Sequence, residues 1–132
     1  MKHLVKIPIG VIHIYENYVV SIINEGETVT VKSNDALAEI ANTYFKSRPF
    51  IYIANRINSY AVDPRVYKKT SLINNLIGFA VVSENLVALS NAKIEKLFFS
   101  RPFESFTTME DAVNWSNLIV SQNNSNLDIL DV

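Results

Sequence analysis

The stretch Phe50–Pro64 reads FIYIANRINSYAVDP and contains the pattern that decides the fold. Its first five residues, Phe50–Ala54, are apolar without alternation, which is typical of a strand covered on both faces in the middle of a parallel sheet. Polar residues follow, and the run closes with Asp63-Pro64, an N-cap residue before a proline at the first helical position. A buried strand therefore leads into an exposed polar loop and a helix N-terminus, where ligands and partners usually bind in open α/β sheets.

The composition is that of one globular domain. The chain has 132 residues, of which 48% are apolar and 19% are charged. A chain of this length and composition can bury a hydrophobic core that is stable without covalent cross-links. A formal net charge of −1 gives no overall field that would attract nucleic acid, so we expect no nucleic-acid partner. The absence of cysteine excludes disulfides, thiolate metal sites and a cysteine nucleophile.

No segment of the sequence predicts a leader or a membrane span. The start, MKHLVKIPIGVIHIY, is interrupted by Pro8 and Gly10, and no small-residue cleavage site follows. No run approaches the ~18 consecutive apolar residues that a spanning helix needs. We therefore expect a cytoplasmic protein with no integral membrane association.

The N-terminal third predicts an antiparallel meander. Its three strands are Val11–Tyr15, Tyr18–Ile23 and Thr28–Lys32, and the strict alternation of the third places its valines on the core side. His13 lies inside the first strand, and we interpret it as a packed or edge residue because no second metal ligand is near it in sequence.

Two helices are predicted around the central strand. The first begins at Ser33 or Asn34 and ends near Ser47, because Pro49 disfavours helical geometry at the residue before it. Five of its residues recur at helical spacing and predict one buried stripe: Leu37, Ile40, Ala41, Tyr44 and Phe45. The second helix runs from Asp63-Pro64 to about Asn75.

The next elements are a buried strand, a helix and a short strand. Ile77–Val82 reads IGFAVV, and its Gly78 is expected to let a neighbouring backbone or ring come close. A third helix spans roughly Leu86–Phe99. Its inward residues are expected to be Val87, Ile94, Leu97 and Phe98. The strand Phe103–Phe106 follows.

A fourth helix and a polar tail end the chain. Thr107 with Glu110 forms a predicted capping box, and the helix extends to about Ser121 with Ala112, Trp115 and Ile119 on one face. Trp115 is therefore interpreted as a packing residue. The domain is predicted to cover residues 1–121. Residues 122–132 are expected to fray, unless Leu127, Ile129 and Leu130 dock on the body.

The fold class that follows is α/β, a single-domain mixed sheet with about four helices in the order βββ-α-β-α-β-α-β-α. The later strands are joined by helical crossovers, which are right-handed in such sheets, and the helices lie mostly on one face or are split unequally. An internal repeat supports this order, because Phe45–Phe50 (FKSRPF) recurs as Phe98–Phe103 (FFSRPF). In each copy we expect proline to end a helix, arginine to reach exposed carbonyls and the last phenylalanine to open a buried strand.

This order resembles the STAS domain, the fold of anti-sigma-factor antagonists, and more narrowly its SpoIIAA-like branch of small stand-alone bacterial proteins. The resemblance covers about residues 9–121. It is carried by YENYVVSII (residues 15–23), IYIANRINSYAVDP (51–64), IGFAVVS (77–83) and the ending IEKLFFSRPFESFTTMEDAVNW (94–115). It implies a regulatory or protein-interaction module.

The resemblance also points to Ser59. In the antagonist proteins a serine after the central strand follows an aspartate, begins the next helix and is phosphorylated by a partner kinase. The nearest counterpart here is Asn58-Ser59, in which asparagine replaces the aspartate and the serine precedes the Asp63-Pro64 helix start by several residues. Ser59 is thus either a phosphorylation site or an ordinary loop serine.

The strongest candidate for a binding surface is the loop after the central strand together with the outer face of the second helix. Its polar and basic residues outnumber a single acid, Asp63. They are Asn55, Arg56, Asn58, Ser59, Tyr60, Arg65, Lys68 and Lys69. Such a group could hold a phosphate, a carboxylate or an acidic protein surface. The alternative is a solvated basic helix face, with Arg56 hydrogen-bonded to loop carbonyls.

No catalytic signature is present in the sequence. The three glycines, Gly10, Gly26 and Gly78, form no phosphate-binding loop, and the two histidines have no carboxylate at ligand spacing. We therefore expect a non-enzyme with no cofactor and no metal. Two hypotheses remain: an interaction module with a protein partner, or a binder of a small apolar or anionic ligand in a pocket beside the loop. A homodimer is compatible with either.

Overall fold

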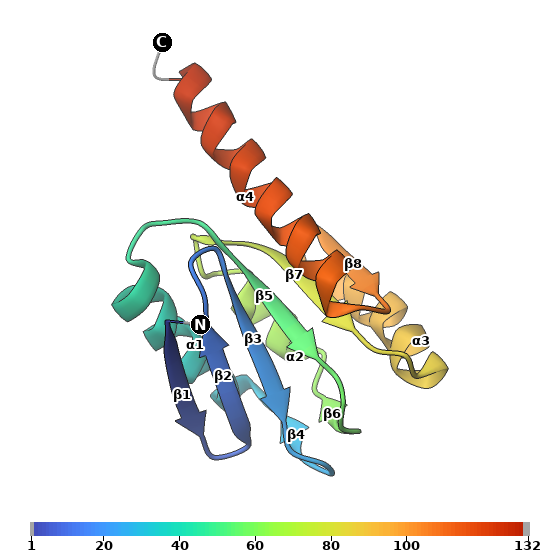
Figure 1. Cartoon of the computed structure of the whole chain (residues 1–132). Coiled ribbons are helices and arrows are strands. Elements are labelled where there is room, and N and C mark those ends of the chain that lie inside the picture. The colour runs from blue at the N-terminus through green and yellow to red at the C-terminus, as the bar shows by residue number, and fades with distance from the viewer. Residues whose placement is uncertain (1, 131–132) are drawn as a thin grey trace.

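A computed structural model of the chain describes residues 2–130, and the side chains of residues 2–125. Six strands form one sheet in the order β1-β2-β3-β5-β7-β8 (Figure 1). Their bounds are His3–Ile7 (β1), Gly10–Ile14 (β2), Tyr18–Ile23 (β3), Phe50–Asn55 (β5), Leu76–Val82 (β7) and Phe103–Phe106 (β8). The first three strands pair antiparallel and the remaining pairs are parallel, so the predicted mixed sheet is confirmed.

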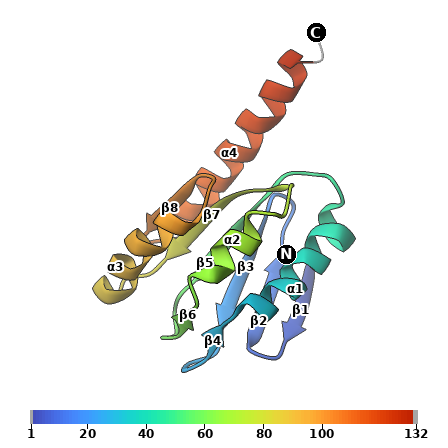
Figure 2. The same ribbon diagram turned by 180° about the vertical axis from the view of Figure 1, so that it is seen from behind.

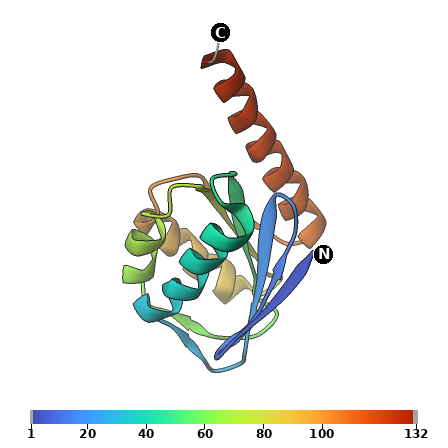
Figure 3. The ribbon, with the colours of Figure 1, turned by 90° about the vertical axis from the view of Figure 1, so that its left-hand side faces the viewer.

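The helices cover the two faces of this sheet unequally, as expected. On one face lie α1 (Asn34–Ile40, continued by a π-helical turn to Phe45), α2 (Arg65–Thr70) and α3 (Leu86–Glu95, continued by a 3₁₀ turn, η3, at Lys96–Phe98). On the other face lies only α4 (Met109–Leu130), among the helices that the structure describes. Figures 2 and 3 show the two layers from behind and from the side.

The central strand is covered on both faces, as its unbroken apolar run predicted. Phe50 packs into the core under α1 and α2, which also contains Phe45, Tyr67 and Phe103. Ile51 and Ile53 belong to the second core, under α4. Parallel strands buried on both faces alternate between two apolar layers, so every position of such a strand is apolar.

The meander was predicted with the wrong outer strand. Its strands are β1, β2 and β3, whereas Thr28–Lys32 is extended only at Thr28–Val29 (β4), followed by a 3₁₀ turn at Val31–Ser33. β4 pairs with Ala61–Val62 (β6) in a separate two-stranded sheet. The cause is topological, because β5 occupies the free edge of β3 that a third meander strand would have used.

The ends of two helices also differ from prediction. α2 ends at Thr70 instead of near Asn75, and the Asn75 side chain instead donates to the carbonyls of Lys46 and Arg48, 3.0 Å away in each case. α4 is capped by Thr108 rather than Thr107, since Thr108 Oγ1 accepts the Asp111 N–H at 3.2 Å.

α4 is longer than its sequence suggested. It continues to Leu130 instead of ending near Ser121, and its C-terminal part projects beyond the sheet (Figure 1). The predicted helix end near Ser121 is therefore wrong, while the fraying expected for residues 122–132 stays a prediction. The suggested docking of Leu127, Ile129 and Leu130 lies outside the side chains that the structure describes, and the division at residue 121 stays a prediction.

Gly78 and the repeated hexapeptide behave largely as expected. A Cβ on Gly78 would lie 3.3 Å from the Trp115 ring and 3.4 Å from the Pro102 carbonyl oxygen, so ring and backbone do come close there. Phe50 and Phe103 are both buried and each begins a strand, but only β5 is buried along most of its length, since Glu104 and Ser105 of β8 are exposed. The two arginines differ in their partners. Arg48 donates to the carbonyl of Tyr44 in its own helical segment and to that of Glu16 before β3, whereas Arg101 donates to carbonyls that follow α2.

The orientation of α3 was predicted wrongly. All four residues expected to face inward are exposed: Val87, Ile94, Leu97 and Phe98. Ala92 and Glu95 face the body instead. The physical reason is an ion pair beneath the helix, which belongs to the candidate site.

Candidate functional site

The loop after β5 is held in place by its backbone. The Arg56 N–H donates to the Val82 carbonyl at 2.9 Å, and the Ser59 carbonyl accepts from the Gly26 N–H at 2.8 Å. The Asn58 side chain donates to the Ile23 carbonyl at 2.9 Å. The loop is therefore tied to β7, to the end of β3 and to the turn before β4, although it carries little regular structure.

Two side chains at the tip of this loop point to solvent. Ile57 is 68% exposed and Ser59 is also exposed. Between the tip and the N-terminal end of α3 lies a groove of about 470 Å³. The groove is lined by Glu25, Arg56, Ile57, Asn58, Ser59, Tyr60, Asn85, Val87, Ala88 and Asn91. Sequence reasoning placed four of these in the site and missed Ile57, because an isolated apolar residue in a polar loop carries no periodic signal.

Arg56 lies under α3 rather than on the surface. Its guanidinium donates to both carboxylate oxygens of Glu95, at 2.7 Å each, and the two side chains are 8% and 11% exposed. The alternative that Arg56 hydrogen-bonds to loop carbonyls is wrong, because its guanidinium binds the carboxylate of Glu95, which lies 39 residues further along the chain. A bidentate buried pair of this kind is rigid and specific.

Two tyrosines complete the surroundings of the ion pair. Tyr67 Oη donates to Glu95, and Arg56 Nη2 donates to Tyr67 Oη at 3.3 Å. The Tyr60 ring lies against the guanidinium, with 5.5 Å between the Arg56 Cζ atom and the ring centroid. Tyr60 is thus packed against Arg56, half-buried at the edge of the groove.

The charges of this cluster are fixed at neutral pH. Burial opposes the charge on Arg56, but the hydrogen bonds to Glu95 hold the pKa of its guanidinium above the usual value. Burial, with the negative charge of Glu95 as the next cause, raises the pKa of the Tyr67 phenol. Arg56 therefore stays charged and Tyr67 stays neutral at neutral pH.

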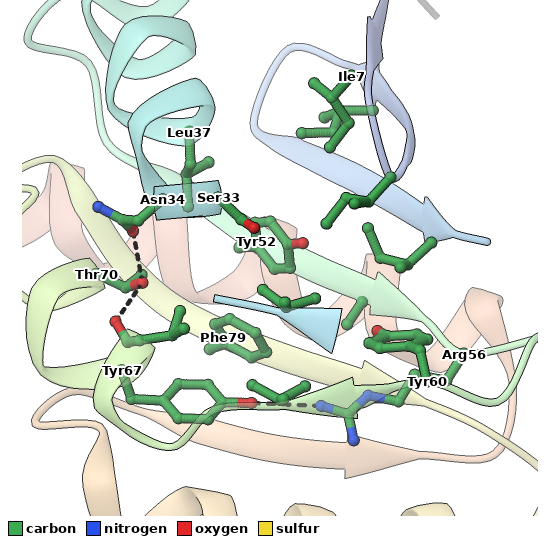
Figure 4. A pocket seen from close by; sticks show the side chains of 17 residues that line it. Ile7, Ser33, Asn34, Leu37, Tyr52, Arg56, Tyr60, Tyr67, Thr70 and Phe79 are labelled. Atoms are coloured by element: carbon green, nitrogen blue, oxygen red, sulfur yellow. Dashed lines mark hydrogen bonds between the residues drawn. The ribbon is translucent and has the colours of Figure 1, made fainter. Parts of the chain in front are cut away.

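A small cavity lies beside the cluster, between the sheet, α1 and α2 (Figure 4). Its free volume is about 50 Å³, which fits a few waters. Apolar side chains such as Leu37 and Phe79 form most of the wall, with Ser33, Asn34 and Thr70 as polar members. The Arg56 Nε atom, also at this wall, is buried and has no hydrogen-bond partner within the described residues.

The cations of α2 do not join the groove. Arg65 is exposed and forms an ion pair with Asp63, whose Oδ2 accepts from Arg65 Nη2 at 2.6 Å; these hydrogen bonds lower the pKa of Asp63. Lys68 and Lys69 are exposed on the outer side of α2, as predicted, but neither lines the groove. Asn55 lines a second depression, of about 580 Å³, on the other side of Ile57.

Ser59 does not lie at a helix N-terminus. β6 stands between it and α2, which begins at Arg65. Its N–H donates to the Glu25 carboxylate at 2.5 Å. A phosphate on this serine would therefore meet a carboxylate and would lack the favourable dipole of a helix start.

No metal site is evident among the side chains that the structure describes, where no three His, Cys, Asp or Glu residues are close enough to share an ion. His3 packs against Tyr44, with 4.7 Å between the ring centroids. Within residues 2–130 no helix combines the length and apolar character needed to cross a bilayer.

Comparison with solved structures agrees with the topology. A protein of the DUF3478 family from Shewanella loihica PV-4, described as uncharacterized and as having a SpoIIAA-like fold, superimposes with a TM-score of 0.51. The match covers 79% of this chain and 89% of the other, at 14% sequence identity. This chain has a SpoIIAA-like fold. No protein-family model matches the sequence, and no curated protein matches it.

Within this SpoIIAA-like fold, sequence reasoning missed one residue that organises the site. The large apolar residues of α3 were predicted to form its inner face, so the inward position of Glu95 on the opposite face was not predicted. A signal was present, because Ala88, Ala92, Glu95 and Phe99 recur at helical spacing and form the side of α3 that faces the body. A lone acid on a stripe of small residues indicates a buried ion pair.

Proposed function

We propose that this protein is a non-catalytic regulatory or interaction module that meets a protein partner through the loop after β5. The observation that carries the proposal is the contrast within that loop. Its backbone is fixed by hydrogen bonds to three other segments, while Ile57 and Ser59 project into solvent at the carboxyl edge of the sheet. A preorganised loop loses little conformational entropy on binding, so an exposed apolar tip on it suits partner recognition.

The groove supports the same proposal. Its wall mixes the apolar Ile57 and Val87 with the amides of Asn58, Asn85 and Asn91, the mixture of an apolar centre and hydrogen-bonding surroundings typical of transient interfaces. The exposed cations Arg65, Lys68 and Lys69 lie outside the groove and would steer an acidic partner rather than hold it. Their contribution would be to the association rate and would weaken with salt.

Site-specific photo-crosslinking in the native host tests this proposal. A photoreactive amino acid at position 57 is expected to give a discrete crosslinked protein, and the same amino acid at Leu118, an exposed apolar residue of α4, is the matched control. Ile57→Asp should abolish crosslinking from a neighbouring position such as Ser59. Equal, diffuse products from positions 57 and 118 would contradict the proposed interface.

A second function, binding of a small apolar or anionic ligand, is favoured by one observation. Arg56 lines the small cavity, and its Nε atom is buried with no hydrogen-bond partner among the described residues. The cavity, at about 50 Å³, is much smaller than the roughly 300–1,000 Å³ of typical ligand sites, so this function ranks second. Native mass spectrometry of protein isolated gently from its host decides the matter, since a bound compound of defined mass would favour the ligand function.

A further inference from the structure

The outer face of α3 and η3 carries a concentration of exposed apolar side chains. Of the nine large apolar residues that are exposed in the described part of the chain, five lie within this one segment. They are Leu86, Val87, Ile94, Leu97 and Phe98, with exposed fractions between 48% and 82%. Monomeric proteins rarely expose contiguous apolar surface of this kind, whereas contact surfaces do.

These residues have the spacing of a helix–helix seam. Val87, Ser90, Ile94 and Leu97 follow one another at intervals of three and four residues, as the seam positions of a coiled coil do. Leu86 and Phe98 flank the seam at its two ends. α3 lies at the periphery of the molecule in both Figure 1 and Figure 2, so the seam is accessible to a second helix.

We propose that two copies of this chain associate through this face, with their α3 helices antiparallel about a twofold axis near Ala92. The sequence is self-complementary about that point. Val87 of one copy lies opposite Leu97 of the other. Ser90, the small member of the seam, lies opposite Ile94, so small meets large at the centre. In a contact about a twofold axis every residue pair occurs twice, once in each direction, and the pairs named above have this property.

Charge selects the antiparallel orientation. Glu84 precedes the helix, the exposed Lys93 lies in its second half, and the exposed Lys96, which is 3.5 Å from Glu104, begins η3. An antiparallel pair brings the Glu84 end of one copy beside the Lys96 end of the other and opposes the two helix dipoles, whereas a parallel pair would place like charges together. The acid within α3, Glu95, is committed to Arg56 on the inner side and does not face the second copy.

The face is also preformed. The Arg56–Glu95 ion pair fixes α3 from beneath, so the apolar side chains are presented without rearrangement of the helix. Val87 belongs to both the groove and this face, but Ile57 lies outside the seam and Leu97 lies outside the groove. Substitutions at Leu97 and at Ile57 therefore test self-association and the proposed partner contact separately.

Sedimentation velocity over a wide concentration range tests the proposal on the full-length chain. The wild type is expected to shift from the 14.9 kDa monomer to twice that mass as concentration rises. Leu97→Glu is expected to remain monomeric, and Leu118→Glu, at an exposed apolar residue of α4, should dimerise as the wild type does. Circular dichroism and thermal melting establish that both variants are folded.

The orientation is tested by disulfide trapping, because the chain contains no cysteine of its own. A mixture of Ser90→Cys and Ile94→Cys proteins is expected to form mainly the crossed disulfide. Preferential Ser90→Cys homodimers would overturn the antiparallel arrangement. A wild type that stays monomeric at every concentration, or a Leu118→Glu variant that loses dimerisation while Leu97→Glu keeps it, would overturn the proposal. Loss of crosslinking at Ile57 alone would leave the dimer intact and refute only the partner interface.

Discussion

α3 and α4 cover opposite faces of the same sheet and are held to it by different interactions. α4 is an ordinary amphipathic helix, with Ala112, Ser116 and Val120 buried against β5 and β7 and, apart from Leu118, polar residues exposed on its outer side. α3 buries Ala92 and the carboxylate of Glu95, and exposes its large apolar residues. One helix is held by apolar burial and the other by a buried ion pair.

The difference shows what each helix is free to do. Where α4 crosses the sheet, its apolar side chains pack against the strands. Trp115, for example, packs against Phe106, with 5.6 Å between the ring centroids. The apolar residues of α3 remain available because small side chains and Glu95 make its contact with the body. A helix attached through its polar side can offer an apolar side to a partner.

Removing the carboxylate under α3 should have the largest effect. Glu95→Ala leaves the Arg56 guanidinium buried without a partner and is expected to lower the free energy of unfolding by about 3–5 kcal/mol. Urea denaturation measures this. Glu104→Ala is the matched control, because its exposed pair with Lys96, at 3.5 Å, contributes about 0–1 kcal/mol. Equal costs for the two variants would contradict a special role for the buried pair.

Removing the aromatic ring under α4 should have the next largest effect. Trp115→Ala empties the space beside Gly78 and is expected to cost about 2–3 kcal/mol, below the range for fully buried rings because Trp115 is half-exposed. Chemical denaturation again reports the change, with Leu118→Ala on the outer side of α4 expected to stay within about 0.5 kcal/mol. A smaller cost for Trp115→Ala than for Leu118→Ala would refute the packing assigned to α4.

Alkaline pH should loosen the α3 side by a smaller amount. Burial and the Glu95 charge raise the pKa of Tyr67 above its ordinary value of 10.0, so the unfolded chain loses this proton at lower pH than the folded chain. Stability is thus fully present below pH 10.0 and falls as pH rises further. Thermal melts between neutral and alkaline pH measure the slope. Tyr67→Phe removes the titrating phenol and should give a shallower slope; an unchanged slope would mean that Tyr67 is not the group responsible.

Polar substitution on the outer face of α3 should have the smallest effect on the monomer. Leu97→Ser removes a side chain that is 82% exposed and is expected to change the free energy of unfolding by no more than about 0.5 kcal/mol in dilute solution. Equilibrium denaturation at low protein concentration measures this value. A loss of several kcal/mol there would show that Leu97 packs against its own chain.

The sequence by itself determined most of the architecture. The unbroken apolar runs at β5 and β7, the proline-terminated junctions and the spacing of Leu37, Ile40 and Phe45 each follow from local periodicity, which reports directly on burial and helical pitch. Even the close contact at Gly78 was predictable, because a glycine inside a buried strand indicates that another group approaches.

Tertiary structure alone decided the candidate site. Arg56 is polar and follows a strand, so its local pattern indicates exposure, and only the approach of α3 supplies Glu95 and buries both charges. The same approach turned the large apolar residues of α3 outward and thereby exchanged a predicted core face for an accessible one. Local sequence patterns cannot predict such an outcome, because the energy of a buried ion pair depends on two residues far apart in the chain. The residues around each member do not indicate which residue will be its partner.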